Sequence, residues 1–222
     1  MSRIIVLTEG QAREIIEQVS TPDYGYHSGD LGKAESFVQY QLGNRDTGHY
    51  GTGTYFVGNK DNLKSGRYVD RPVVTHDFSG YNLLKPGSFD LGIRLHDALK
   101  YINNTAWLQA KREGSVDIKG LQKALWPLSV MLYSHMHRDE DYNYGPEDVR
   151  KFNNEIVVPR AIELLEEYSD FVKQQGGSVT KSDRNTISTE LLKSFGIEGI
   201  DVRNVPDLDN TEFGSVIFDV RK

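Results

Sequence analysis

Cysteine is absent from all 222 residues of the chain. Its absence excludes disulfide bonds, thiolate zinc sites and a cysteine nucleophile. A chain without cysteine fits a reducing compartment, so we expect a cytoplasmic protein.

Long hydrophobic runs are also missing. No run approaches the roughly 18 apolar residues that a membrane-spanning helix needs. The apolar stretch at residues 4–7 is too short for the core of a secretory signal peptide,. We therefore expect no membrane partner.

Positive charge is scarcer than negative charge. The chain has 26 lysines and arginines against 32 aspartates and glutamates, a formal net charge of −6, and it has no basic block. A large electrostatic footprint for nucleic acid is therefore not expected. The length is sufficient for one large domain with a sizeable core.

Strands are predicted near both ends of the chain. Their signals are β-branched and aromatic residues in short alternating runs. The runs are residues 4–7, 24–27, 54–57, 73–78, 197–202 and 215–220. Short helices are predicted at 8–19, with Thr8 as N-cap and Gln11 at the capping-box position, and at 36–42 and 61–68. The glycine-rich residues 48–53 predict a loop, and residues 79–86 predict a strand with a turn.

The middle of the chain is helical by spacing. Leucines and isoleucines recur at helical intervals over residues 91–102, 121–132 and 149–168, and Pro159 is expected to kink or restart the third helix,. A shorter helix follows, capped near Ser188 and ended by Gly196. Strands at both ends with helices between them predict an α+β fold. We expect one domain over residues 1–222, with residues 88–177 as a helical insertion.

Three short segments carry residues suited to holding a planar cationic ring. The first is Tyr-His-Ser-Gly at residues 26–29, and the second is Gly-Thr-Gly-Thr-Tyr-Phe at residues 51–56. The third places Glu212 just before the last predicted strand. Side chains alternate along a strand, so Tyr55 and Phe56 point opposite ways and one of them can face a cleft. An aromatic face attracts a cationic ring such as a pyridinium.

Together these segments resemble the ADP-ribosyltransferase superfamily, in its His–Tyr–Glu class of diphtheria-toxin and poly(ADP-ribose) polymerase type. The resemblance covers about half of the chain, and it implies a split β-sandwich that binds NAD+ as substrate between two small sheets. It implies that His27 bonds a ribose hydroxyl and that Tyr55 stacks on nicotinamide. Glu212 would stabilise the oxocarbenium ion as nicotinamide leaves.

The resemblance also implies the residues that surround NAD+. Backbone at Ser28 and Gly29 would hold the carboxamide, Gly53 would leave room beside the ligand, and Tyr68 would add a second aromatic wall. Tyr50 is the alternative second tyrosine.

The chain departs from the pattern of this class at two points. Members usually have glycine directly after the histidine, where this chain has Ser28. The usual glutamate position of the last strand falls on Gly214, and Glu212 lies two residues earlier, on the same face if the strand extends that far. Asp209 and Asn210 are the other candidates for the role of that carboxylate.

The resemblance implies an enzyme, a mono-ADP-ribosyltransferase-like protein that cleaves NAD+ and transfers ADP-ribose to a macromolecule. Protein is the favoured acceptor and nucleic acid stays open. The distribution of the family suggests a bacterial or phage toxin or effector that acts in a bacterial or host cytosol. An NAD+ glycohydrolase and an inactive partner-binding module are the alternatives.

A metal-binding adaptor is a third alternative. His135 and His137 form a His-x-His pair of the kind that can bind a transition metal,. The pair lies at a predicted helix end with no third histidine nearby, so a solvated loop is the favoured interpretation and no metal site is assigned.

Overall fold

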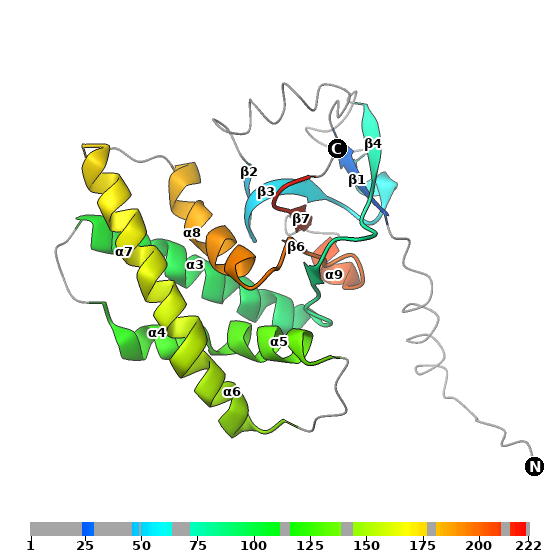
Figure 1. Ribbon diagram of the computed structural model, residues 1–222. Coiled ribbons are helices and arrows are strands. Elements are labelled where there is room, and N and C mark those ends of the chain that lie inside the picture. The colour runs from blue at the N-terminus through cyan, green and yellow to red at the C-terminus, as the bar shows by residue number, and fades with distance from the viewer. Residues whose placement is uncertain are drawn as a thin grey trace, which may run out of the picture.

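The mixed α+β class predicted from the sequence is confirmed. The structure, a computed structural model, describes residues 24–28, 46–48, 50–63, 72–111, 116–138, 144–176, 181–209 and 214–220. In Figure 1 the strands gather on one side of the molecule and the longer helices on the other. The elements expected at 4–7, 8–19 and 36–42 lie outside the described residues. So do three predicted site residues, namely Gly29, Tyr68 and Glu212.

The larger sheet has five short strands in the order β2-β3-β7-β6-β5. Its strands are β2 (Asp46–Gly48), β3 (Gly51–Phe56), β5 (Leu83–Leu84), β6 (Gly199–Ile200) and β7 (Ser215–Ile217). Neighbouring strands run antiparallel except β5 and β6, which are parallel. Strands from the two ends of the chain therefore meet in the middle of one sheet, at β3 and β7.

The smaller sheet pairs β1 (Tyr24–Ser28) with β4 (Val73–Asp77) in antiparallel register. Within the described part of the chain, an isolated bridge joins it to the larger sheet. Tyr26 and Val57 exchange two backbone hydrogen bonds there, of 2.8 and 2.9 Å. The strand predictions at residues 24–27 and 73–78 are confirmed to within one residue, and β1 is held beside the end of β3.

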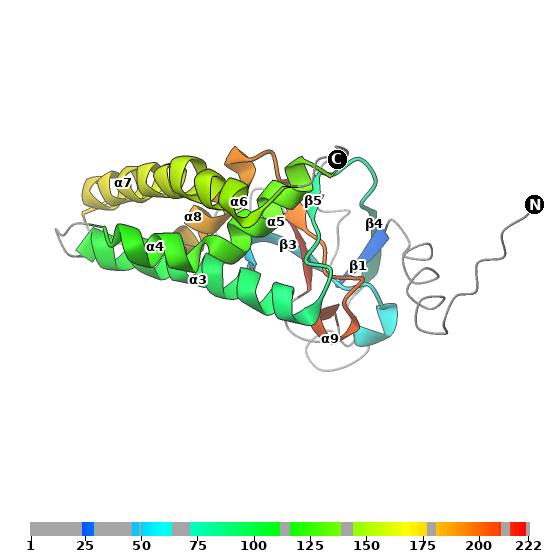
Figure 2. The same cartoon turned by 90° about the horizontal axis from the view of Figure 1, so that it is seen from below.

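The helices form a block over one face of the larger sheet (Figure 2). They are α3 (Phe89–Lys111), α4 (Ile118–Ala124), α5 (Trp126–Met136), α6 (Pro146–Phe152), α7 (Val158–Gln174) and α8 (Lys181–Ser194), and a short α9 (Pro206–Asp209) follows β6. A π-helical segment, η4 (Asn153–Val157), separates α6 from α7, and a 3₁₀ turn, η2 (Lys60–Leu63), follows β3. No described helix is both long and apolar enough to span a bilayer.

Two helix predictions differ from the structure for local reasons. Residues 121–132 form two helices because the chain turns at Leu125, and Pro127, which has no N–H to donate, lies in the first turn of α5,. Ser188 is not an N-cap: it lies inside α8, buried, where its hydroxyl accepts from Asn103 Nδ2 at 3.1 Å. Pro159 restarts the third helix as predicted, since α7 begins at Val158.

The loop predicted at residues 48–53 is wrong for residues 51–53, which belong to β3, and only residue 50 is a turn among its described residues outside the strands. Gly51 begins β3, and a Cβ built on Gly53 would lie only 2.5 Å from the carbonyl oxygen of Ile217. The glycines therefore allow β3 to approach β7 closely instead of forming a loop. The strand-and-turn prediction for residues 79–86 is confirmed by the turn at residues 79–80 and by β5.

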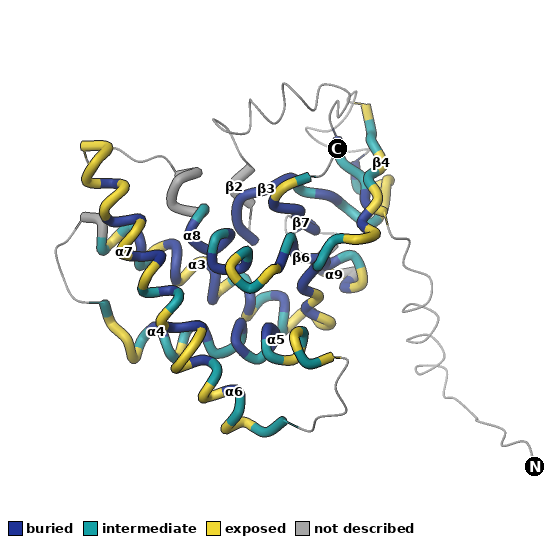
Figure 3. Tube along the Cα trace, in the orientation of Figure 1, coloured by how far each residue is buried: buried dark blue, intermediate teal, exposed yellow. Residues whose placement is uncertain are grey.

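One large core joins the sheet to the helices. Its fully buried members come from strands and helices alike, among them Leu84, Leu99, Leu132, Leu165, Leu191 and Val216. Figure 3 shows buried segments in both the helices and the sheet. A smaller cluster on the other face of the sheet contains Phe56, Phe78, Leu83 and Ile217. Trp107 and Trp126 are only half-buried.

Candidate functional site

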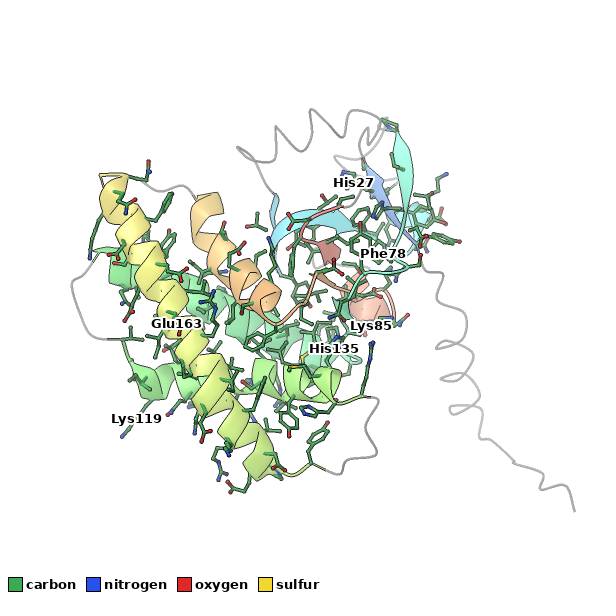
Figure 4. The ribbon with its side chains drawn as sticks, viewed as in Figure 1. His27, Phe78, Lys85, Lys119, His135 and Glu163 are labelled. Carbon is green, nitrogen blue, oxygen red and sulfur yellow. The ribbon has the colours of Figure 1, made fainter. Side chains whose placement is uncertain are left out.

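The predicted site residues His27 and Tyr55 are brought together by the bridge between the sheets. The carbonyl oxygen of Tyr55 lies 2.8 Å from Nδ1 of His27. A carbonyl can only accept, so Nδ1 carries the proton and Nε2 of the neutral ring is the acceptor nitrogen. The histidine, labelled in Figure 4, is thereby fixed at the edge of β3 in a single tautomer.

Tyr55 is fixed at the far end of its ring. Its hydroxyl donates to the carbonyl oxygen of Gly51 at 2.9 Å and accepts from the backbone N–H of Tyr50 at 2.9 Å. The ring is half-buried and packs against the larger core, whereas Phe56 is 1% exposed in the smaller one. The predicted opposite directions of Tyr55 and Phe56 are therefore confirmed.

Tyr50, the alternative second tyrosine, is a core residue. It is fully buried, and its hydroxyl donates to the carbonyl oxygen of Gly92 at 3.3 Å. Burial raises the pKa of Tyr50 well above its usual value. Its ring therefore supports the start of α3, and its N–H supports Tyr55.

Gly214 lies directly against the ring of Tyr55. Ser215 pairs with Phe56 across β3 and β7, and a Cβ built on Gly214 would lie 3.4 Å from Tyr55 Cδ1. The same Cβ would lie 3.1 Å from the carbonyl oxygen of Phe56, and Gly214 has a φ of +50°. The position matched to the glutamate of the resembled class is thus next to Tyr55, in a conformation that favours glycine.

The remaining predicted residues are only partly described. Ser28 is buried at the end of β1, and its hydroxyl oxygen has no hydrogen-bond partner among the described residues. Gly53 lies in β3 beside β7. Asp209 ends α9, and Asn210 and Glu212 lie outside the described residues.

A carboxylate that the sequence reasoning missed lies at the same end of the sheet. Asp201 follows β6 and is buried, and its Oδ1 accepts from the hydroxyl of Ser215 at 3.2 Å. Both of its oxygens accept from Arg203 at 2.8 Å. Burial raises the pKa of Asp201, but the guanidinium of Arg203 outweighs burial and holds that pKa below its usual value. Asp201 is therefore an ionised anchor for Arg203.

Arg203 ties the two sheets together. Its Nη1 donates to the backbone carbonyl of Tyr24 in β1 at 2.7 Å, and its guanidinium lies 4.0 Å from the centre of the Phe78 ring. The sequence signal was an acid and an arginine two residues apart, at the end of the strand predicted at residues 197–202. Such a pair is easily read as a solvated turn, so burial was the missing information.

The histidine pair at the end of α5 is engaged within the protein. His135 Nε2 lies 2.8 Å from Oδ1 of Asn82, and His137 Nδ1 donates to the carbonyl oxygen of Tyr133 at 2.8 Å. The rings of His137 and Tyr133 are stacked, with centroids 4.2 Å apart. Within the described ranges, no group of three or more metal-ligating side chains is assembled.

No family model matches this chain, and no curated protein or solved structure is significantly similar to it. The function is therefore inferred from the residues themselves.

Proposed function

We propose that this protein is a mono-ADP-ribosyltransferase-like enzyme that cleaves the bond between nicotinamide and ribose in NAD+. The observation that carries the proposal is the contact between His27 and Tyr55. Two segments 28 residues apart meet through the 2.8 Å hydrogen bond, where two small sheets join. The bond joins the His27 ring to the backbone of Tyr55 and brings the two residues together, and the resembled class grips NAD+ with a histidine and a tyrosine, which supports the proposal.

Each residue has a role in the proposed reaction. His27, with its Nδ1 proton held by Tyr55, would accept a hydrogen bond from a ribose hydroxyl at Nε2. The Tyr55 ring would stack on the nicotinamide, which is cationic until it leaves. Glu212 would face the ribose and stabilise the positive charge that develops as the glycosidic bond breaks. A nucleophile of the acceptor would then attack C1 of the ribose.

Nicotinamide release tests the proposal. Purified protein is incubated with NAD+, alone and with a cell lysate, and wild type is compared with Glu212→Gln. We expect release by wild type, stimulation by the lysate, and at least a hundredfold loss in the variant, roughly the cost of losing one transition-state contact of this kind. Folded wild-type protein that releases no nicotinamide under either condition would contradict the proposal.

The inactive partner-binding module is the second candidate. It is favoured by Gly214, which occupies the usual glutamate position with a positive φ and a Phe56 carbonyl close to any added Cβ. NAD+ binding by calorimetry without nicotinamide release would support this candidate. An NAD+ glycohydrolase differs only in that water is the acceptor, so free ADP-ribose as the sole product, even with lysate, would identify it.

We propose that the helical insertion, residues 88–177, which is the part of the helical block before α8, selects the acceptor. The block shares one core with the sheet, so deleting it would expose that core. Surface variants are the better test. Lys119, Lys123, Arg150 and the half-buried Trp126 line a hollow of about 430 Å³ on this block. Charge reversal at Lys119 and Lys123 should leave nicotinamide release intact and reduce modification of lysate proteins; equal loss of both activities would exclude this role.

A further inference from the structure

One peptide group at the start of β3 is held at both of its ends. Its carbonyl oxygen, which belongs to Gly51, accepts from the hydroxyl of Tyr55 at 2.9 Å. Its N–H, which belongs to Thr52, donates to the hydroxyl oxygen of Thr189 in α8 at 2.8 Å. This peptide group therefore connects the ring of Tyr55 to a side chain of the helical block.

The helix end of this connection is buried and firmly held. Thr189 and Thr52 are both fully buried. The side-chain amide of Asn103 in α3 holds the neighbouring Ser188, because its Oδ1 accepts from the Ser188 N–H at 3.0 Å and its Nδ2 donates to the Ser188 hydroxyl at 3.1 Å. The helix α8 packs against both α3 and β3 (Figure 1). The hydroxyl of Thr189 is thus fixed beside β3 by hydrogen bonds that water does not reach.

The start of β3 lies very close to α8. A Cβ built on Gly51 would lie 2.6 Å from Oγ1 of Thr189 and 3.3 Å from Oγ of Ser188, and Gly51 has a φ of +109°. The strand therefore begins in a conformation that favours glycine, directly against the helix. A change at the Thr189 hydroxyl acts first on the peptide group between Gly51 and Thr52.

We propose that Thr189 is a positioning residue for Tyr55. The inference rests on the proposed function, in which the Tyr55 ring stacks on nicotinamide. The Thr189 hydroxyl fixes the peptide group, and the Gly51 carbonyl of that group fixes the Tyr55 hydroxyl, so the ring keeps one orientation before NAD+ arrives. A ring that is ordered in advance loses less conformational entropy when the ligand binds. Thr189 acts only through Tyr55.

Amide hydrogen exchange of the full chain, followed by NMR without NAD+, tests the connection directly. Thr189→Val keeps the shape of the side chain and leaves the buried Thr52 N–H without its acceptor,. The Tyr50 N–H donates to the Tyr55 hydroxyl at 2.9 Å and reports whether that hydroxyl is still held. We expect Tyr50 to exchange at least about tenfold faster relative to Leu99 in the core of α3,. Thr189→Ser keeps the hydroxyl and should stay within about threefold of wild type.

Steady-state kinetics tests the consequence for NAD+. Thr189→Val should raise KM for NAD+ about fivefold with kcat unchanged, because the displaced peptide group pulls the Tyr55 ring out of place in ground state and transition state alike. Thr189→Ser should restore KM. Tyr55→Phe cuts the connection, so adding Thr189→Val to that variant should raise KM by less than about twofold more,.

Ser129→Ala is the matched control. It also removes a buried hydroxyl, which donates to Oδ1 of Asn153 at 2.7 Å within the helical block. It should lower stability and leave both KM and the exchange of Tyr50 relative to Leu99 unchanged. A merely structural role of Thr189 would make the two variants behave alike.

Three results would overturn the inference. They are unchanged Tyr50 exchange in Thr189→Val, equal acceleration of that exchange in Ser129→Ala, and an equal rise of KM whether or not the Tyr55 hydroxyl is present. Wild-type protein that releases no nicotinamide would contradict the proposed function instead. The exchange of Tyr50 would then still decide whether Thr189 positions Tyr55, so the two failures are distinguishable.

Discussion

His27 Nδ1 lies 2.8 Å from the carbonyl oxygen of Tyr55, so the histidine of one sheet is fixed by the backbone of the other. The hydrogen bond does two things at once. It closes the junction between the sheets, and it sets the tautomer that leaves Nε2 as an acceptor. A change at His27 is therefore expected to affect both stability and the proposed chemistry.

Replacing His27 separates these two effects. His27→Ala should reduce nicotinamide release by at least tenfold and lower the free energy of unfolding by about 1 kcal/mol, the net worth of one hydrogen bond. Release is measured under saturating NAD+, and stability by urea unfolding. His76→Ala is the matched control. It removes a histidine that stacks on Phe56 at 5.3 Å, so it should cost stability while release per folded molecule persists. Equal loss of release in the two variants would contradict a specific role for His27.

The ring and the hydroxyl of Tyr55 make separate contributions. Tyr55→Phe keeps the ring but leaves the Tyr50 N–H and the Gly51 carbonyl without their partner, and this should cost about 1–3 kcal/mol in urea unfolding,. The KM for NAD+ should change by less than about threefold, because the stacking face is kept. Tyr55→Leu removes the face and should raise KM by about tenfold or more. If KM responds equally to both changes, the ring does not stack on nicotinamide.

Asp201 is expected to matter for the fold at low pH. Its pKa in the folded state lies below the usual unfolded value of about 3.9,. Its contribution to stability is therefore fully present above that value and is lost as the pH falls through the lower folded pKa. Urea unfolding at a series of pH values should show this loss below about pH 4, and the loss should be smaller in Asp201→Asn.

The same variant should be severely destabilised at neutral pH. Asp201→Asn leaves the buried guanidinium of Arg203 without its counter-charge, at a cost of about 3–5 kcal/mol,. Asp219→Asn is the matched control, since Asp219 forms a 2.8 Å pair with Lys193 but is 61% exposed. It should cost less than about 1 kcal/mol. Comparable losses in the two variants would mean that Arg203 does not depend on Asp201.

Gly214 should tolerate a side chain poorly. Gly214→Ala meets a φ of +50° and a Phe56 carbonyl 3.1 Å from the new Cβ, so we expect a loss of about 2 kcal/mol,. Gly176→Ala meets a similar φ of +66° but open space, so it should lose only about 1 kcal/mol. Thermal unfolding of the two proteins isolates the effect of the close approach. An equal loss would indicate that only the backbone conformation requires glycine.

A metal-free state should be indistinguishable from the protein as purified. His135 and His137 bond Asn82 and the Tyr133 carbonyl, so chelator is expected to leave the melting temperature unchanged within about 1 °C. Added zinc should not raise it. If chelator lowered the melting temperature and added zinc restored it, the metal-binding alternative would be supported.

The sequence predicted correctly those described elements whose residues carry one clear local signal. The α+β class, β1, β4, α3 and the restart at Pro159 followed from periodicity and from proline chemistry. Residues 51–53 were misread because glycine favours loops, whereas here it allows two strands to approach closely,. Leucine spacing predicts one helix over residues 121–132, but the chain turns at Leu125 and Pro127 lies in the first turn of a second helix,.

The candidate site was predicted only in part. His27 and Tyr55 were predicted from the motifs that their flanking residues form; the structure brings the two residues into contact, and their role stays a prediction. The partnership of Asp201 and Arg203 could not be predicted. It depends on which turns the sheet brings together, and no local pattern encodes the pairing of Arg203 with a backbone carbonyl 179 residues away.

That long separation has a consequence for how the chain folds. The bond from Arg203 to Tyr24 closes over 179 residues, and the bond from the Thr52 N–H to the Thr189 hydroxyl closes over 137. Contacts so distant along the chain form late, because closing such a loop costs conformational entropy before the contact itself can offset that cost. During synthesis β1 and β3 leave the ribosome long before β6 and β7, and the helical block can collapse first. β3, which carries Tyr55, can pair with β2 early but must wait for β7 with its other edge unpaired, and chaperones that shield such an edge are expected to raise the yield of folded protein,.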